Sequence, residues 1–235
     1  MVLTNSVLAT TALVQEDLPV DLTVGELAIK KPSAAIRVGL IIFPPIIEKQ
    51  IDDQCHGPAL TDIRRLFAAQ DLKVNFLCAS PSRIYRLFNE NKIDLTINVK
   101  STSSLANNVL YSERPYIQLS VSLYTRQDAS NKDISSVNKF EYHGMRDKLS
   151  REGYEFKDQG NPEESFAVFL RGGTDYLISY KRPFNAYLQT ISQVQTISVL
   201  DTNFTEEVLT TAPSFFIVNG NSKNAELILE VVNAL

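Results

Sequence analysis

The sequence lacks the excess of positive charge that marks a nucleic-acid-binding protein. Its 235 residues include 23 lysines and arginines against 27 aspartates and glutamates, which gives a net charge of −4 and a pI near 5.3. The basic residues are interspersed with acidic ones, so no basic stripe is available to follow a phosphate backbone. We therefore expect no nucleic-acid partner.

Long apolar runs are absent as well, since no stretch reaches the roughly 18 apolar residues that a membrane-spanning helix requires. The hydrophobic content of 44% is nevertheless ample for one large or two small domains with proper cores. Residues 1–35 include a moderately apolar stretch, "VLTNSVLATTALVQEDLP", which fits either the remnant of a secretory signal or a loosely docked N-terminal extension.

Cysteine and histidine are scarce, with only two of each in the chain. No C-x-x-C pair is present, and only His56 and His143 could supply imidazole ligands, so the sequence predicts no metal site and indicates no cofactor. Cys55 and Cys78 fit a single disulfide in an oxidising compartment and equally fit two buried thiols. Their spacing does not decide between these alternatives.

What the chain does contain is a regular alternation of apolar strands and amphipathic helices. The β-branched run at 35–47 ends at a double proline and predicts a buried strand, and residues 72–79 and 92–99 predict two more. Between them, residues 58–70 and 81–91 have the apolar spacing of helices with proline in the first turn. This order predicts βαβ units, and therefore an α/β fold with a mainly parallel sheet flanked by helices.

The second half of the chain repeats this pattern. Residues 116–127 predict a strand that crosses out of the first unit, and the polar, turn-rich residues 128–136 indicate the exit from it. A second alternation of helices and strands occupies 140–190 and is followed by a strand at 214–221 and a terminal helix at 224–235. We therefore expect two similar α/β lobes.

A polar segment follows one of the predicted strands. Ligands of parallel α/β sheets bind at the carboxyl ends of the strands. Lys100, Ser101 and Thr102 come directly after the strand at 92–99 and would present donors to such a cleft. An ordinary solvated loop would have the same composition, so this position alone does not decide the role of the segment.

Several short motifs occur in a characteristic order. Gly57 opens the first predicted helix, Arg83 begins the second, "NKID" at 91–94 leads into the third strand, "YSERPY" at 111–116 precedes the crossing strand, and a helix–glycine–Asp–strand step in the second half contains Asp175. Together these motifs resemble the bacterial extracellular solute-binding proteins of family 3, which include the polar amino-acid-binding proteins of ABC importers. The "YSERPY" turn departs from that family's "S-x-P-Y" pattern by one inserted residue.

The resemblance covers roughly residues 36–235 and implies a type II periplasmic-binding-protein fold. In that fold, two lobes, each a mainly parallel sheet flanked by helices, are joined by two crossing strands and close on a solute. It predicts lobe 1 at 36–122 and 218–235 and lobe 2 at 123–217, after an N-terminal extension at 1–35. It also implies that Cys55 and Cys78 both lie at the cleft-facing end of the first sheet, which favours a disulfide between them.

The charged groups that hold an amino acid in this family are absent. An Arg seven residues before the serine of the "S-x-P-Y" turn grips the α-carboxylate of the ligand in the family, but counting back from Ser112 gives Leu105. An Asp five residues after the Asp of the second lobe pairs with the α-ammonium, but five residues after Asp175 is Tyr180. A standard α-amino acid is therefore not the expected ligand.

Aromatic and polar residues take the place of these groups. The predicted ligand-binding residues are Phe43, Lys100, Ser101, Thr102, Tyr116, Tyr180 and Arg182. Aromatic faces with a few donors suit a small, partly apolar or planar ligand, and Lys100 and Arg182 would also accommodate an anionic one. The alternative for Phe43 and Tyr116 is plain core packing.

The resemblance therefore predicts a periplasmic solute-binding protein, secreted across the inner membrane and monomeric. Its partners would be a small-molecule ligand and either a membrane permease for ABC-type uptake or a membrane sensor, with closure of the two lobes as the mechanism.

The first alternative is an enzyme on the same scaffold, of the dehydratase or lytic type. Its acid–base candidates would be Glu48, Asp52, Asp53 and Glu113, but they lie in loops without an evident partner, so we expect no catalysis. The second alternative is the effector domain of a transcription regulator, but residues 1–35 contain no helix-turn-helix pattern.

Overall fold

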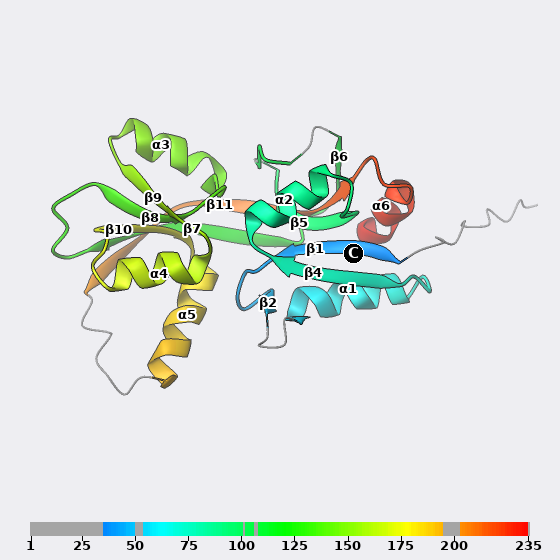
Figure 1. Ribbon diagram of the computed structural model, residues 1–235, viewed down its shortest axis with the longest axis horizontal. Helices are drawn as coiled ribbons and strands as arrows, with labels where there is room; N and C mark the ends of the chain where they lie inside the picture. The colour runs from blue at the N-terminus through cyan, green and yellow to red at the C-terminus, as the bar shows by residue number, and fades with distance from the viewer. Residues whose placement is uncertain (1–34, 50–53, 101, 106–107, 195–202, 235) are drawn as a thin grey trace, which may run out of the picture. The chain divides into compact units, whose positions relative to one another are not determined.

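The computed structural model describes residues 35–49, 54–100, 102–105, 108–194 and 203–234 (Figure 1). The predicted N-terminal extension, apart from residue 35, lies outside this range, as do Ser101, Asp52 and Asp53. Within the described residues, no helix is long and apolar enough to cross a membrane.

The first half of the chain forms the parallel sheet that the alternation predicts. Strand β1 (Ile36–Ile41) lies between β4 (Val74–Ala79) and β5 (Leu95–Val99) and is parallel to both. Helices α1 (Pro58–Ala68) and α2 (Pro81–Asn89) connect these strands, and each begins with proline in its first turn. The alternation of strands and helices predicted for residues 35–99 is confirmed.

Helix α1 begins directly after Gly57, and any other residue at this position would be strained. Gly57 has a φ of 120°, and a Cβ atom built there would lie 2.5 Å from the carbonyl oxygen of Ile46. The amide of Ala59 also donates to that oxygen, at 3.2 Å. The start of α1 is therefore packed against the turn that follows β1.

Two long antiparallel strands connect the two halves. Strand β7 (Ile117–Arg126) pairs with β11 (Phe204–Asn219) from Ser214↔Ile117 to Phe204↔Arg126, with a β-bulge between Val208 and Thr210. On their other sides, β11 pairs with β5 and with the short β6 (Val109–Tyr111), and β7 pairs with β10 (Tyr176–Tyr180). Figure 1 shows β7 in green and β11 in orange running between the two groups of elements.

The expectation for the last strand was partly wrong, because β11 begins at Phe204 rather than at 214. Residues 205–208 are exposed and mostly polar, so their composition does not indicate a strand. Hydrogen bonding to β7 holds them in the extended conformation.

The second half contains a strand that the sequence did not reveal. Strand β8 (Asp133–Val137) lies within the segment that we expected to be a turn, and it is parallel to β10 and to β9 (Glu155–Gln159). Its serines are buried, and the Ser135 hydroxyl donates to the carbonyl oxygen of Ser165 at 2.9 Å. Because two of its four buried positions are serines, β8 has no continuous apolar pattern to recognise.

Helices complete both halves. Helices α3 (Met145–Arg151), α4 (Pro162–Leu170) and α5 (Lys181–Val194) belong to the second half, where a 3-10 turn, η1 (Tyr142–Gly144), precedes α3. Helix α6 (Ala225–Asn233) packs on β11, β6 and α1. The chain is thus a two-lobed α/β protein with one continuous sheet in the order β4-β1-β5-β11-β7-β10-β8-β9. The predicted residue ranges of the lobes stay predictions.

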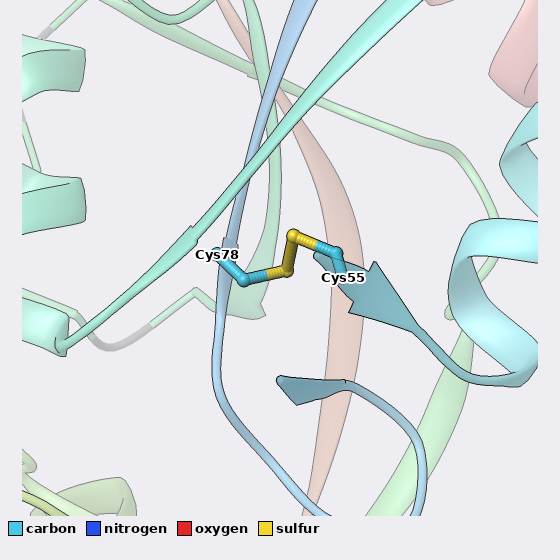
Figure 2. The surroundings of a disulfide bond; sticks show 2 residues. All are labelled: Cys55 and Cys78. Atoms are coloured by element: carbon cyan, nitrogen blue, oxygen red, sulfur yellow. A yellow bond between two sulfur atoms is a disulfide. The ribbon is translucent and has the colours of Figure 1, made fainter. Parts of the chain in front are cut away.

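The two cysteines form a disulfide, which confirms the expected pairing (Figure 2). Cys78 lies near the carboxyl end of β4, and Cys55 lies on β3 (Cys55–His56), which forms a small hairpin with β2 (Glu48–Lys49). The two Cα atoms are 5.7 Å apart. The bond therefore anchors this hairpin to the edge of the first sheet.

Candidate functional site

A cavity of about 50 Å³ lies at the carboxyl ends of parallel strands from both halves of the chain. It begins where β1 and β5 end, extends past the first residues of β7, and reaches the end of β10. The described residues that line it are Ile41, Phe43, Ile46, Ile47, Ile97, Asn98, Tyr116, Ile117, Leu119, Phe140, Tyr180 and Ser214. This is the edge of the sheet where α/β proteins bind ligands.

Aromatic rings from both halves of the chain meet at this cavity. The ring of Tyr180, at the end of β10, lies 5.2 Å from that of Phe43, which follows β1. It also lies 5.8 Å from Phe140 and 5.7 Å from Tyr142, both of which follow β8. All four rings are buried, and their tilted or edge-on contacts have the geometry that aromatic pairs prefer.

Tyr180 lies at a position where the resembled family carries an aspartate. Burial raises the pKa of its hydroxyl far above the ordinary value, and the nearby Tyr85 and Tyr142 raise it further. The side chain is therefore uncharged at neutral pH and cannot replace a carboxylate.

A tight turn after β1 presents apolar side chains to the cavity. The amide of Phe43 donates to the Ile47 carbonyl at 2.7 Å, and the amides of Ile46 and Ile47 donate to the Phe43 carbonyl at 2.9 and 3.0 Å. The Pro44–Pro45 bond within this turn is cis. Because the turn closes on itself, Phe43, Ile46 and Ile47 all reach the same cavity.

Asn98 is a polar residue of the lining, and its side chain already has several partners. Its Nδ2 donates to the Tyr85 hydroxyl at 2.9 Å. Its Oδ1 accepts from the Val99 amide at 2.8 Å and from the Thr102 hydroxyl at 2.9 Å. Thr102 therefore holds Asn98 in position and does not itself line the cavity.

Tyr116 contributes its ring to the cavity and turns its hydroxyl to α1. The hydroxyl donates to Asp62 at 3.0 Å, and the ring lies 5.0 Å from that of Phe216. Burial, reinforced by the Asp62 carboxylate, raises the pKa of Tyr116 well above its ordinary value. Its hydroxyl therefore stays protonated and bound to Asp62.

Arg146 stabilises the loop that carries Phe140 and Tyr142. Arg146 donates to the carbonyl oxygens of Phe140 and Val137 at 2.9 and 3.1 Å, and it pairs with Asp158 at 2.8 Å. The Tyr142 hydroxyl accepts from the Val137 amide at 2.8 Å. These bonds fix Phe140 and Tyr142 beside the cavity.

The structure brings three of the predicted binding residues together, namely Phe43, Tyr116 and Tyr180. It does not place Lys100, Thr102 or Arg182 in the lining. The Lys100 ammonium lies 4.2 Å from the centre of the Phe215 ring and 5.2 Å from that of Tyr111, and Arg182 is exposed on α5. Ser101 lies outside the described residues. Whether any of these residues binds a ligand stays a prediction.

Sequence reasoning missed several lining residues for a physical reason. Phe140 follows β8, the strand with serines in its core, so nothing indicated that it would reach the end of a strand. Ser214 lies within the long β11, opposite Ile117, and only the pairing of the two crossing strands places it at the cavity.

The other positions singled out by the family motifs are structural here. Leu105 is 8% exposed and belongs to the hydrophobic core. Asp175 accepts from the amides of Asn131 and Ser130 at 2.6 and 2.7 Å, and these bonds lower the pKa of its carboxyl. The Asp175 carboxylate therefore stabilises a turn.

Of the acidic residues considered for catalysis, Glu48 and Glu113 do not line the cavity, and Asp52 and Asp53 lie outside the described residues. Glu48 pairs with His56 at 2.8 Å on the β2–β3 hairpin. Across the described part of the chain, no group of three or more His, Cys, Asp or Glu residues is arranged to hold a metal ion.

Solved structures with this arrangement are numerous, although comparison of the sequence with protein-family models and with curated proteins gives no match. An ancestral arginine-binding protein bound to arginine is similar with a TM-score of 0.69 at 18% identity, over 85% of this chain and 89% of that one. A histidine kinase sensor domain with similarity to periplasmic binding proteins has a TM-score of 0.68 at 14% identity, over 85% and 86%.

A third similar structure is a putative binding component of an ABC transporter from Wolinella succinogenes, complexed with lysine. Its TM-score is 0.67 at 17% identity, and the likeness covers 86% of this chain and 88% of that one. At these identities the likeness concerns the fold. The chain therefore has the two-lobed type II periplasmic-binding-protein fold that the motifs imply.

Proposed function

We propose that this chain is a solute-binding protein whose two lobes, 36–122 with 218–235 and 123–217, close on a small molecule, and that the ligand is not an α-amino acid held in the usual way. The observation that carries the proposal is the cavity between rings of both lobes, with Tyr180 in its wall. Leu105, where the family's arginine would stand, is buried in the core.

The mechanism follows from the position of the cavity. Phe43 belongs to the first half of the chain, and Phe140 and Tyr180 belong to the second, so a ligand between them contacts both. Ligand binding would therefore shift the population from an open to a closed arrangement, with β7 and β11 absorbing the change as hinge strands.

The proposed location is the periplasm, or another compartment outside the cytoplasm. The disulfide supports this location, because such bonds persist in oxidising compartments. The ligand-loaded protein would deliver its solute to an ABC permease or report it to a membrane sensor. A sensor domain of a histidine kinase and a binding component of an ABC transporter both occur among the structures with this fold. None of the described lining residues is an acid or a histidine, which supports ligand binding as the proposed role.

The experiment that tests the proposal is thermal unfolding of the purified protein against amino acids, polyamines, carboxylates, nucleobases and aromatic compounds. A ligand at 100 times its dissociation constant adds about 2.7 kcal/mol to the free energy of unfolding. For a chain of this length, each kcal/mol raises the midpoint by about 2–4 °C.

A shift of this size from one class of solute would support the proposal. A shift from free α-amino acids alone would overturn the part of it that concerns the missing charged groups. A flat response to every class, confirmed by titration calorimetry with the same compounds, would contradict solute binding.

A further inference from the structure

We infer that the site, once the lobes part, takes an uncharged, largely apolar ligand with few hydrogen-bonding groups. This inference rests on the proposed function and narrows it to a class of ligand. Eight of the twelve described lining residues carry no polar side-chain atom, and none of the twelve is charged. A charged group placed among them would lose its water without gaining a partner of opposite charge.

Two of the four polar side chains in the described lining, Asn98 and Tyr116, are committed to the protein. The Asn98 side chain has three hydrogen bonds, to Tyr85, Val99 and Thr102. The hydroxyl of Tyr116 is donated to Asp62. A ligand with several donors and acceptors would therefore leave many of them without a partner, which is unfavourable in a buried site.

Three charged residues of the elements around the cavity, Asp62, Arg146 and Lys100, are also occupied. Asp62 holds both the Tyr116 hydroxyl and Arg65, the latter at 2.8 Å. Arg146 pairs with Asp158 and lies 4.5 Å from the centre of the Phe156 ring. Lys100 lies over the rings of Phe215 and Tyr111. A ligand carboxylate or ammonium group would have to break one of these arrangements.

The aromatic contacts indicate the shape of the ligand. Phe43 and Tyr180 come from different lobes, and their rings are 5.2 Å apart. Opening of the cleft would separate these two rings and remove their edge-on contact. A flat apolar ring inserted between them would restore an aromatic contact to each, whereas a strongly hydrated solute would not.

The test uses benzyl alcohol and benzamide as neutral probes, with benzoate and benzylammonium as charged probes of matched size. Equilibrium binding to the full chain is measured by titration calorimetry at pH 7. We expect both neutral probes to bind at least about tenfold more tightly than both charged ones, because the cavity offers no partner for a charge.

A variant that fills the cavity shows whether the probes bind there. In Ile117→Trp, a larger side chain at a partly exposed lining position would occupy the space, and we expect at least about a tenfold loss of affinity for the neutral probes. The matched control is Val208→Trp on the same pair of strands, at a side chain that is 51% exposed and away from the lining. Binding to this control should equal binding to the wild type.

Each outcome decides between the proposals. If benzoate or benzylammonium binds as tightly as the neutral probes and is lost in Ile117→Trp, the chain binds solutes but the inferred class is wrong. If the neutral probes bind Ile117→Trp and Val208→Trp equally well, the cavity is not their site and the inference falls. If none of the four probes binds the folded wild type, the inference is overturned, and the solute panel alone then decides the proposed function.

Discussion

At the residue scale, the ion pair between Arg37 and Asp94 connects three segments of the chain. Asp94, whose side chain is 6% exposed, accepts from the Arg37 amide, Nε and Nη2 and from the Ser222 hydroxyl. Burial alone would raise the pKa of Asp94, but the hydrogen bonds from Arg37 and Ser222 outweigh it and lower the pKa. This carboxylate links β1, the start of β5 and the loop after β11.

We expect Asp94→Asn to lower the free energy of unfolding by about 2 kcal/mol at pH 7, because a buried charged acceptor is lost while its donors remain. The folded-state pKa of Asp94 lies below the unfolded value of about 3.9. Its contribution is therefore complete above that pH and disappears as the pH falls through the folded pKa. Urea unfolding at pH 7 and at pH 3 measures both effects.

The control for this prediction is Asp128→Asn. Asp128 also pairs with an arginine, Arg126 at 2.9 Å, but its side chain is 70% exposed. Exposed ion pairs contribute about 0–1 kcal/mol to the free energy of unfolding. Equal losses in the two variants would show that the burial of Asp94 is not what matters.

At the scale of elements, the cavity depends on the turn between β1 and the β2–β3 hairpin. Gly57 packs against this turn, and the Cys55–Cys78 bond anchors the hairpin that follows it. The turn carries Phe43, Ile46 and Ile47, all of which line the cavity. Changes at its supports should therefore reach the candidate site.

Gly57→Ala should destabilise the protein by about 2–3 kcal/mol, because an alanine at a φ of 120° is strained and its Cβ would meet the Ile46 oxygen. Gly153→Ala is the matched control, since Gly153 also has a positive φ of 87° but nothing within 4 Å of the added atom. We expect the control to cost about 1 kcal/mol. Chemical denaturation of both variants compares them, and a control as costly as Gly57→Ala would refute the proposed clash.

Removal of the disulfide is a second test at this scale. The bond closes a loop with a sequence separation of 23 residues, for which the chain-entropy model gives about 3 kcal/mol of stabilisation. Dithiothreitol should therefore lower the thermal midpoint of the wild type and leave that of a Cys55→Ser/Cys78→Ser variant unchanged. A wild type that is insensitive to complete reduction would show that the bond adds nothing to stability.

At the scale of the whole molecule, two halves of the chain contribute to one cavity. The turn at Phe43 and the loop with Phe140 and Tyr142 are far apart in the sequence and touch through Tyr180. Ligand binding should therefore slow amide exchange in both halves at once. Strand β9, at the far edge of the sheet, should change little.

Hydrogen exchange measures this coupling. With a ligand at 100 times its dissociation constant, amides of the turn at 43–47 and of the loop at 137–142 should exchange up to about 100-fold more slowly, because opening must then compete with binding. Amides of Glu155–Gln159 should change much less. Protection confined to one of the two segments would mean that the ligand does not bridge the lobes.

The sequence by itself determined the order of elements in the first half and the two-lobed α/β fold, whereas the pairing of the two cysteines was favoured only by the family resemblance. The apolar residues of a strand or helix recur with the period of its buried face. This pattern can be recognised in the sequence without a structure. The motif positions also predict that Leu105 and Tyr180 stand where the resembled family has charged groups.

Only the tertiary structure decided which residues surround the cavity. Strand β8 has serines where an apolar pattern would be expected, and the first residues of β11 are exposed, so both became strands through pairing with neighbours far away in the sequence. Phe140 and Ser214 depend on these two strands for their position. Lys100 follows β5 as expected, but it lies over Phe215 and Tyr111 and outside the cavity lining, because side-chain packing and not strand order determines which groups a cavity contains.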